Sequence, residues 1–164
     1  MKLNALIHSL RRSITLSISL IVVSVFGVST VWGAGSCTLN PASPPAFPGK
    51  IFRQTWNWTS DASGDVDDSS CTSKGINGDL LYCETNPDDT AAPTDNYDGV
   101  LNNANGTDMM GGAMSDRDTA NNELATPLVG AAYAYVRVDG PLSLVISAAG
   151  GTMQGSVTCL FESK

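Results

Sequence analysis

Carboxylates are the residues of this sequence whose type and spacing could support chemistry. The stretches SDASGDVDDSS, residues 60–70, and PTDNYD, residues 93–98, together hold six of the sixteen acidic residues. Carboxylate oxygens are the ligands that Ca²⁺ prefers, and alternating positions can bring several of them to one ion. The candidate calcium ligands are therefore Asp61, Asp65, Asp67, Asp95 and Asp98.

Turns are the competing interpretation of both stretches. The EF-hand pattern fails after Asp61, because the sixth position is Val66 rather than Gly and no Glu closes the loop. The second stretch continues into GVLNNANGTDMM, where the pair Asn105-Gly106 suits a turn between strands at 97–101 and 107–110. Solvated turn residues are thus favoured over a calcium site, and no other cofactor is expected.

Residues 1–33 have the features of a secretory signal peptide. Lys2, Arg11 and Arg12 precede an uncharged run, and Val31-Trp32-Gly33 places small residues around a cleavage site. Cleavage after Gly33 or Gly35 is favoured over retention of the segment as a membrane anchor. The sequence therefore predicts an exported protein, located in the periplasm, at the cell surface or outside the cell.

Removal of this segment excludes several chemistries from the mature chain. The only histidine, His8, leaves with it, so neither a Ser-His-Asp nor a Cys-His mechanism is available, and imidazole zinc ligands are absent. Two carboxylates that act together as in a glycosidase would need to face each other across a cleft. A β-sandwich of about 130 residues rarely provides such a cleft. We therefore expect that the protein is not an enzyme.

The charge balance of the mature chain also argues against nucleic acid and anionic membranes as partners. Three of the nine basic residues precede the cleavage site, which leaves six basic against sixteen acidic residues and a net charge of −10. Such a surface repels nucleic acid and anionic membranes. We expect neither nucleic-acid binding nor membrane association after cleavage.

The four cysteines, Cys37, Cys71, Cys83 and Cys159, predict two disulfides because their number is even in a chain expected to be exported. The segment SSCTSKGINGDLLYCE predicts a hairpin centred on Asn77, which would place Cys71 opposite Cys83. The remaining pair would join Cys37 to Cys159. A thiolate metal site is disfavoured because no C-x-x-C spacing occurs, and lipidation of Cys37 because it would leave three cysteines.

Alternation of apolar and polar residues predicts β-strands through most of the mature chain. KIFRQTWNWTS places Phe52, Trp56 and Trp58 on one face, and AAYAYVRVDG places Tyr133 and Tyr135 opposite Ala and Val. The two Trp and two Tyr side chains could stack on a sugar if they were exposed. Because both Trp residues share a face with Phe52, the core is their favoured location.

These strands predict an all-β fold, a single antiparallel β-sandwich of jelly-roll type over residues 50–164. PLSLVISAAG and MQGSVTCLFES are expected to form a terminal hairpin across Gly150-Gly151. Residues 34–49 are rich in proline and are expected to be an extended lead-in to this domain.

Five segments of the chain, in order and spacing, resemble a group of small, mostly uncharacterised β-proteins of phages and prophages. The segments are TWNWTSDASGDV, PTDNYD, NGTDMMGG, DRDTANNE and VDGPLSLVISAAGG, within residues 55–151. The group looks like virion-associated components. The resemblance implies a β fold without enzymatic activity, and it supplies no catalytic residues. The signal peptide and the four cysteines set this chain apart from the group.

The sequence therefore predicts a non-enzymatic exported module that is structural or binds a protein partner, through self-assembly or with another chain. A module that binds carbohydrate or another small ligand, with or without calcium, is the alternative.

Overall fold

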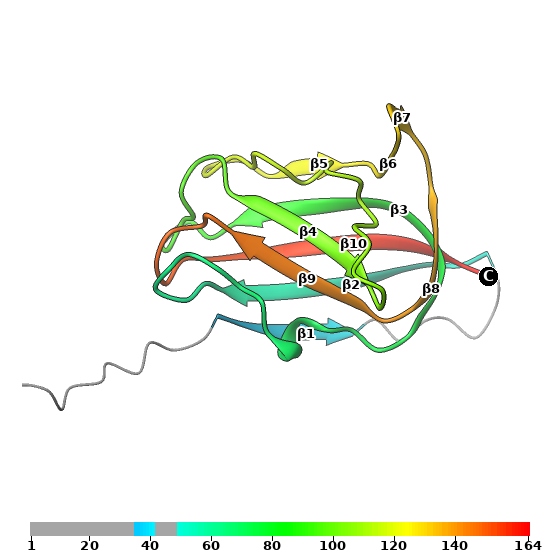
Figure 1. The fold of residues 1–164 in the computed structure, drawn as a ribbon, viewed down its shortest axis with the longest axis horizontal. Helices are drawn as coiled ribbons and strands as arrows, with labels where there is room; N and C mark the ends of the chain where they lie inside the picture. The colour runs from blue at the N-terminus through cyan, green and yellow to red at the C-terminus, as the bar shows by residue number, and fades with distance from the viewer. Residues whose placement is uncertain (1–34, 42–48) are drawn as a thin grey trace, which may run out of the picture. The chain divides into compact units, whose positions relative to one another are not determined.

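The computed structural model describes residues 35–41 and 49–164. The predicted signal peptide and residues 42–48 of the proline-rich stretch lie outside the described residues. The described residues form one short 3-10 turn and ten strands (Figure 1), which are β1 (Ser36–Pro41), β2 (Ile51–Thr59), η1 (Ser69–Cys71), β3 (Ile76–Pro87), β4 (Asp98–Asn103), β5 (Glu123–Ala125), β6 (Leu128–Val129), β7 (Ala132–Tyr133), β8 (Val136–Gly140), β9 (Leu142–Ser147) and β10 (Gln154–Ser163). The predicted all-β fold is confirmed.

Sheet A is the larger layer and contains six antiparallel strands. Its order is β1-β2-β10-β3-β5, and β8 also pairs with β3. The inner face follows the predicted alternation on β2, where Phe52, Trp56 and Trp58 are buried and Arg53 and Asn57 are exposed. This face is apolar because side chains of a strand point alternately to opposite sides of the sheet.

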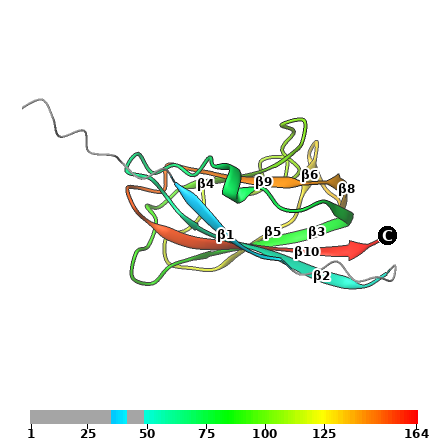
Figure 2. The ribbon, with the colours of Figure 1, turned by 90° about the horizontal axis from the view of Figure 1, so that it is seen from below.

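Sheet B contains β4 and β9 and lies over the inner face of sheet A, as Figure 2 shows. Leu101 on β4 and Leu142, Leu144 and Ile146 on β9 are fully buried. The two layers therefore enclose one core, in which the largest fully buried side chains are those of Trp56, Trp58, Tyr97, Phe161, Leu80, Met110 and Met114. This arrangement is the sandwich that the sequence predicts.

Both edges of sheet B are covered by irregular chain. Single bridges join Val66 to Ile146 and Thr72 to Ser143 beside β9. On the β4 side, Gly99 N donates a hydrogen bond to the Met114 carbonyl at 2.8 Å. Covered edges leave few unpaired backbone groups and protect a small sheet from pairing with other chains.

The predicted terminal hairpin is wrong. β9 pairs with β4, whereas β10 pairs with β2 and β3, so these two consecutive strands belong to different layers. Both carry an apolar face that must point into the core, and alternation alone gives the same pattern for paired strands and for strands that face each other across the core.

The turn of the hairpin predicted within residues 97–110 is confirmed. The second strand of that hairpin is shorter than predicted. β4 begins at Asp98, and Gly106 has a φ of +76° in the turn. The returning segment meets β4 through one bridge, Asn102 to Asp108, and through Met109 N, which donates to the Leu101 carbonyl at 2.8 Å. Asn-Gly therefore serves a backbone conformation, as predicted.

The expected lead-in at 34–49 contains a strand of the sheet. β1 pairs along its whole length with β2, from Ser36 opposite Thr59 to Pro41 opposite Gln54. Proline fits there because β1 is the first strand in the order of sheet A, and an edge position tolerates a residue without an N–H group.

Candidate functional site

The two predicted disulfides are present, but the predicted pairing is wrong. Cys37 bonds to Cys71, and Cys83 bonds to Cys159. No hairpin forms around Asn77, because the pair Asn77-Gly78 lies inside β3. A Cβ atom on Gly78 would come within 2.6 Å of the Glu162 carbonyl oxygen, so glycine is needed there for close approach of β3 to β10.

Antiparallel pairing of β3 with β10 places Cys83 directly opposite Cys159 on the inner face of sheet A, next to a register shift between Leu160 and Phe161. Both side chains are fully buried, which suits a core disulfide. The two disulfides indicate an oxidising environment outside the cytoplasm.

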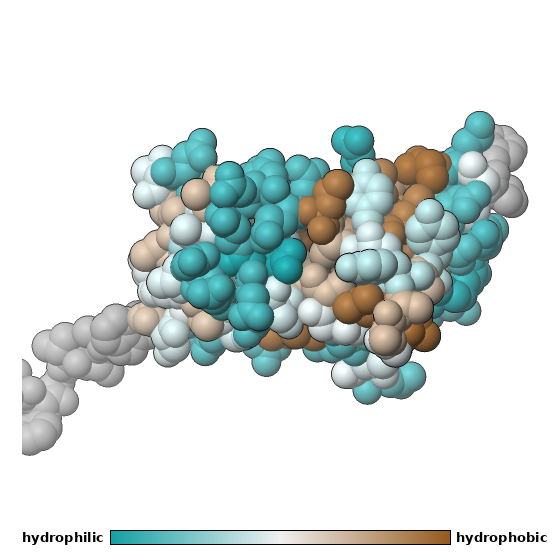
Figure 3. Space-filling model, turned by 90° about the horizontal axis from the view of Figure 1, so that it is seen from above, coloured by the Kyte–Doolittle hydropathy of each residue, from teal (hydrophilic) through white to brown (hydrophobic). Residues whose placement is uncertain are grey.

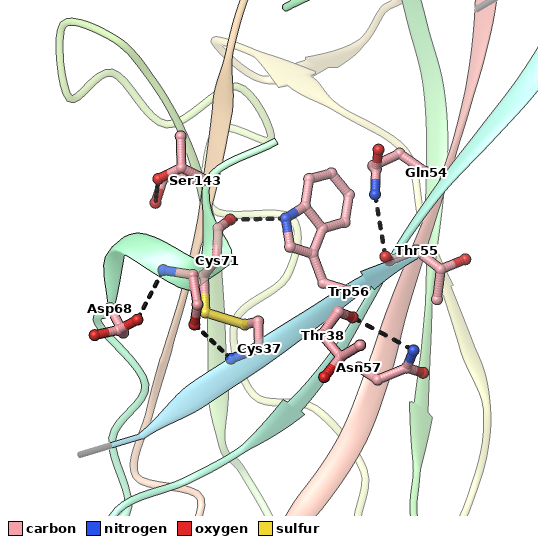
Figure 4. Close-up of a disulfide and its surroundings, with 11 residues drawn as sticks. Cys37, Thr38, Gln54, Thr55, Trp56, Asn57, Asp68, Cys71 and Ser143 are labelled. Atoms are coloured by element: carbon pink, nitrogen blue, oxygen red, sulfur yellow. Dashed lines mark hydrogen bonds between the residues drawn. A yellow bond between two sulfur atoms is a disulfide. The ribbon is translucent and has the colours of Figure 1, made fainter. Parts of the chain in front are cut away.

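The Cys37–Cys71 disulfide fastens the edge strand β1 to η1 (Figure 4). Cys37 N donates to Ser70 Oγ at 2.9 Å, and Asp68 Oδ1 accepts from Ser70 N at 2.7 Å. Trp56 Nε1 donates to the Cys71 carbonyl at 2.8 Å. Trp56 thus satisfies its one polar group inside the core and is a structural residue.

The four candidate stacking residues fall into two pairs. Trp56 is fully buried and Trp58 is 2% exposed, so neither offers a ring face to a ligand. Tyr133 and Tyr135 are 76% and 69% exposed. The structure therefore separates the Trp residues, which are in the core as predicted, from the Tyr residues, which are free for contact.

Four of the candidate calcium ligands lie in loops, Asp98 is the first residue of β4, and the five are not gathered. Within residues 35–41 and 49–164, no three His, Cys, Asp or Glu side chains are placed to hold a metal ion. Asp61 Oδ1 instead accepts from Ser63 N at 2.8 Å and Asp65 N at 3.0 Å, and Asp98 Oδ1 accepts from Asp116 N at 2.9 Å. Asp65, Asp67 and Asp95 lie in the same two loop regions, 60–68 and 88–97, as the sequence suggested.

Backbone N–H groups are the hydrogen-bond partners of four loop aspartates. The N–H of Asp65 lowers the pKa of Asp61 most strongly, and the N–H of Ala91 does so for Asp88. The N–H groups of Ser70 and Ala120 act in the same way on the pKa values of Asp68 and Asp118. These carboxylates stabilise turns, because a charged acceptor bonds strongly to otherwise unpaired donors.

Three of the five segments singled out in the sequence, at residues 55–66, 93–98 and 138–151, pack together. Ala149 N donates to the Gly64 carbonyl at 2.9 Å, and Thr94 N donates to the Ala149 carbonyl at 2.8 Å. Gly64 has a φ of +94°, and a Cβ atom there would lie 2.7 Å from Gly150 N. The residue pattern of these loops is therefore explained by backbone packing.

Exposed apolar side chains gather between β5 and β8. Four of the five large exposed hydrophobic residues lie there, and we call them the β5–β8 surface: Leu124 (69% exposed), Val129 (59%), Tyr133 and Tyr135. In Figure 3 hydrophilic side chains cover the left half of this side of the molecule, whereas several separate apolar patches lie among paler residues from the centre to the right. The sequence singled out the two Tyr residues only, because the short strands of Leu124 and Val129 show no clear alternation.

One hydrogen bond ties the β6–β7 hairpin to the segment around Met110, and a second closes the base of the hairpin. Leu128 N donates to the Met110 carbonyl, and Ala134 N donates to the Pro127 carbonyl, each at 3.0 Å. Gly111, at a φ of +59°, permits this contact, since a Cβ atom there would lie 2.1 Å from the Leu128 carbonyl oxygen. Gly111 of NGTDMMGG thus positions the β6–β7 hairpin of the β5–β8 surface.

A polar pocket of about 400 Å³ lies across four strands of sheet A and shares no lining residue with the β5–β8 surface. It was not predicted, because its residues become neighbours only through strand pairing. The lining comes from β1, β2, β10, the end of β3 and the loop after it: Thr38, Asn57, Trp58, Thr59, Asn86, Pro87, Asp88, Asp89, Gln154, Gly155 and Ser156.

In comparisons with protein-family models, curated proteins and solved structures, nothing matches the chain. No helix within the described ranges is long and apolar enough to cross a membrane.

Proposed function

We propose that this protein is an exported, non-enzymatic module that binds a protein, either a second copy or another chain, through the β5–β8 surface. The observation that carries the proposal is the concentration of four of the five large exposed hydrophobic side chains within residues 124–135. Exposed apolar side chains that cluster mark interaction sites more often than scattered ones do.

The chemistry of the surface supports a protein partner. Tyr side chains combine a large apolar ring with a polar hydroxyl and are enriched at the centres of interfaces. Tyr133 and Tyr135 have two χ angles each, so ordering them on binding costs little conformational entropy. The disulfides and the anchored β6–β7 hairpin hold the surface in one arrangement before a partner arrives, which reduces the cost of binding.

An enzymatic role has less support. The loop aspartates that suggested acid chemistry accept backbone N–H bonds, and the aromatic residues Trp56 and Trp58 are core residues. Export through cleavage of the signal peptide, and an origin among phage virion components, complete the proposal. They rest on the sequence features of residues 1–33 and on the resemblance of residues 55–151.

Site-specific photo-crosslinking tests this function. A benzophenone amino acid replaces Tyr133 in the exported protein, and the matched control replaces Lys74, which is also exposed but lies outside the β5–β8 surface. We expect a discrete adduct from position 133, with a second copy or with one other protein, and none from position 74. Equal labelling from both positions, or no adduct from position 133, would contradict the proposal.

A further inference from the structure

We propose that the polar pocket of sheet A is a carbohydrate-binding site that accepts neutral or amino sugars. The pocket lies on the outer face of the sheet, opposite the core, and none of its lining residues belongs to the β5–β8 surface. Its volume of about 400 Å³ falls in the range of small-ligand sites. The proposal does not depend on the function proposed above.

Strand register aligns the polar side chains of the pocket in one row. Thr38 pairs with Asn57, Asn57 with Ser156, and Ser156 with Asn86, so four hydroxyl or amide groups lie side by side across four strands. Figure 4 shows Thr38 and Asn57 next to each other, on the side of β2 opposite to Trp56. Neighbouring strands are about 4.8 Å apart, which sets the spacing of these groups.

The hydrogen-bonding capacity of this row is largely unused within the described residues. Within residues 35–41 and 49–164, no hydrogen bond involves the side chains of Thr38, Asn86 or Ser156, and Asn57 makes one long bond of 3.4 Å from Nδ2 to the Thr38 carbonyl. The next row along the sheet differs, because the hydroxyls of Thr55 and Thr158 bond to each other at 2.9 Å. The pocket thus offers donors and acceptors together, which is what the hydroxyl groups of a sugar require.

The charges of the lining restrict the ligand further. Asp88 and Asp89 are the charged residues of the lining, which contains no Lys or Arg. Asp88 Oδ1 accepts from Thr90 N and Ala91 N at 2.8 Å, which fixes the loop that carries both carboxylates. Carboxylates accept hydrogen bonds from hydroxyl or ammonium groups and repel phosphate, sulfate and uronate groups.

Trp58 connects the pocket to the core and provides a reporter. It lines the pocket, its indole Nε1 is buried without a hydrogen-bond partner, and a Cβ atom on its neighbour Gly155 would lie 2.6 Å from Trp58 Cζ2. Because the ring is 2% exposed, it cannot stack on a sugar, so hydrogen bonds must supply the affinity. We therefore expect dissociation constants in the millimolar range, roughly 4 kcal/mol of binding free energy.

The test uses the oxidised mature protein and three trisaccharides: cellotriose, the trimer of N-acetylglucosamine and the trimer of galacturonic acid. Titration to about 10 mM is followed by tryptophan emission and by amide shifts in ¹⁵N-correlation spectra. We expect saturable shifts at Asn57, Asn86 and Ser156 with at least one of the two neutral sugars and none with the acidic one.

Matched variants separate a site from a general effect of sugar. Asn57→Ala and Asn86→Ala should weaken binding at least about fivefold, since each removes hydrogen bonds to the ligand. Asn40→Ala, on the same face of β1 but outside the lining, should leave affinity unchanged. Absence of saturable shifts with both neutral sugars, stronger binding of the acidic trimer, or equal effects of all three variants would overturn the proposal.

Discussion

Two adjacent glycines, Gly111 and Gly112, are needed for different reasons, and substitution of each can tell the two reasons apart. Gly111 and Gly112 both have positive φ, +59° and +82°. A Cβ atom on Gly111 would lie 2.1 Å from the Leu128 carbonyl oxygen, whereas one on Gly112 would meet nothing within 4 Å. The left-handed conformation costs about 1 to 2 kcal/mol for any other residue, so this cost applies at both positions.

We predict that Gly111→Ala displaces the β6–β7 hairpin and that Gly112→Ala does not. Hydrogen exchange of residues 125–136 should accelerate in the first variant only, because its Cβ atom forces the Leu128 carbonyl away. Both variants should lose stability through the shared conformational cost. Similar exchange rates in the two variants would show that the close contact at Gly111 does not hold the hairpin.

Acid should destabilise the fold through its turn aspartates. The pKa values of Asp61, Asp68, Asp88 and Asp118 are lowered in the folded chain by backbone N–H bonds. A lowered pKa in the folded state contributes stability above the unfolded value, near 3.8, and this contribution is lost as the pH falls through the folded value.

We therefore expect the melting temperature to fall below about pH 4, with little change between pH 5 and 7. A variant with Asn at positions 61, 68, 88 and 118 should lose much of this dependence, because Asn accepts the same bonds without titrating. The same melts, run with calcium and with chelator, should coincide if these acids serve turns. A rise in melting temperature with calcium would instead favour the cation site.

At the scale of the strand pair, the two disulfides differ in what they hold. Cys37–Cys71 closes a separation of 34 residues and Cys83–Cys159 one of 76 residues. In the chain-entropy account these loops correspond to about 3.8 and 4.5 kcal/mol. Cys83 and Cys159 are both fully buried, whereas in the other disulfide Cys71 is fully buried and Cys37 only partly, so removal of Cys83–Cys159 leaves the larger cavity.

We predict that Cys83→Ala with Cys159→Ala costs more stability than Cys37→Ala with Cys71→Ala. The second pair of substitutions should mainly loosen β1 and η1, visible as faster hydrogen exchange at Leu39 and Ser70. Denaturant unfolding of both double variants under non-reducing conditions gives the comparison. Peptide mapping that finds Cys71 bonded to Cys83 would refute the structural pairing itself.

The strands also show how far the sequence predicts this fold. Period-two alternation was sufficient for β2, because one face of that strand is buried and the other is exposed. It failed at Asn77-Gly78, where a residue pair typical of turns serves close strand packing. Which strand pairs with which depends on contacts distant in sequence, so the pocket row from Thr38 to Asn86 could not be predicted.

For the whole molecule, the separation of the β5–β8 surface from the fold's core gives a direct prediction. Leu124→Ser with Tyr135→Ser should change the free energy of unfolding by about 0.5 kcal/mol or less, because both side chains are exposed. The same change should abolish the adduct formed from position 133. Ile51→Ser is the matched control, since Ile51 is the fifth exposed apolar residue and lies at the start of β2. Loss of the adduct with Ile51→Ser would show that the surface is defined wrongly.

The last prediction concerns where the mature molecule begins. Gly35 is buried against the loop after β2, and a Cβ atom on it would lie 2.3 Å from the Asp65 carbonyl oxygen. Cleavage after Gly33 keeps this contact, whereas cleavage after Gly35 removes it and places a charged amino group on Ser36, the first residue of β1. We therefore predict that the exported protein starts at Ala34. Intact-mass measurement of the exported chain distinguishes the two starts, and a chain that begins at Ser36 would show that the packing of Gly35 is dispensable.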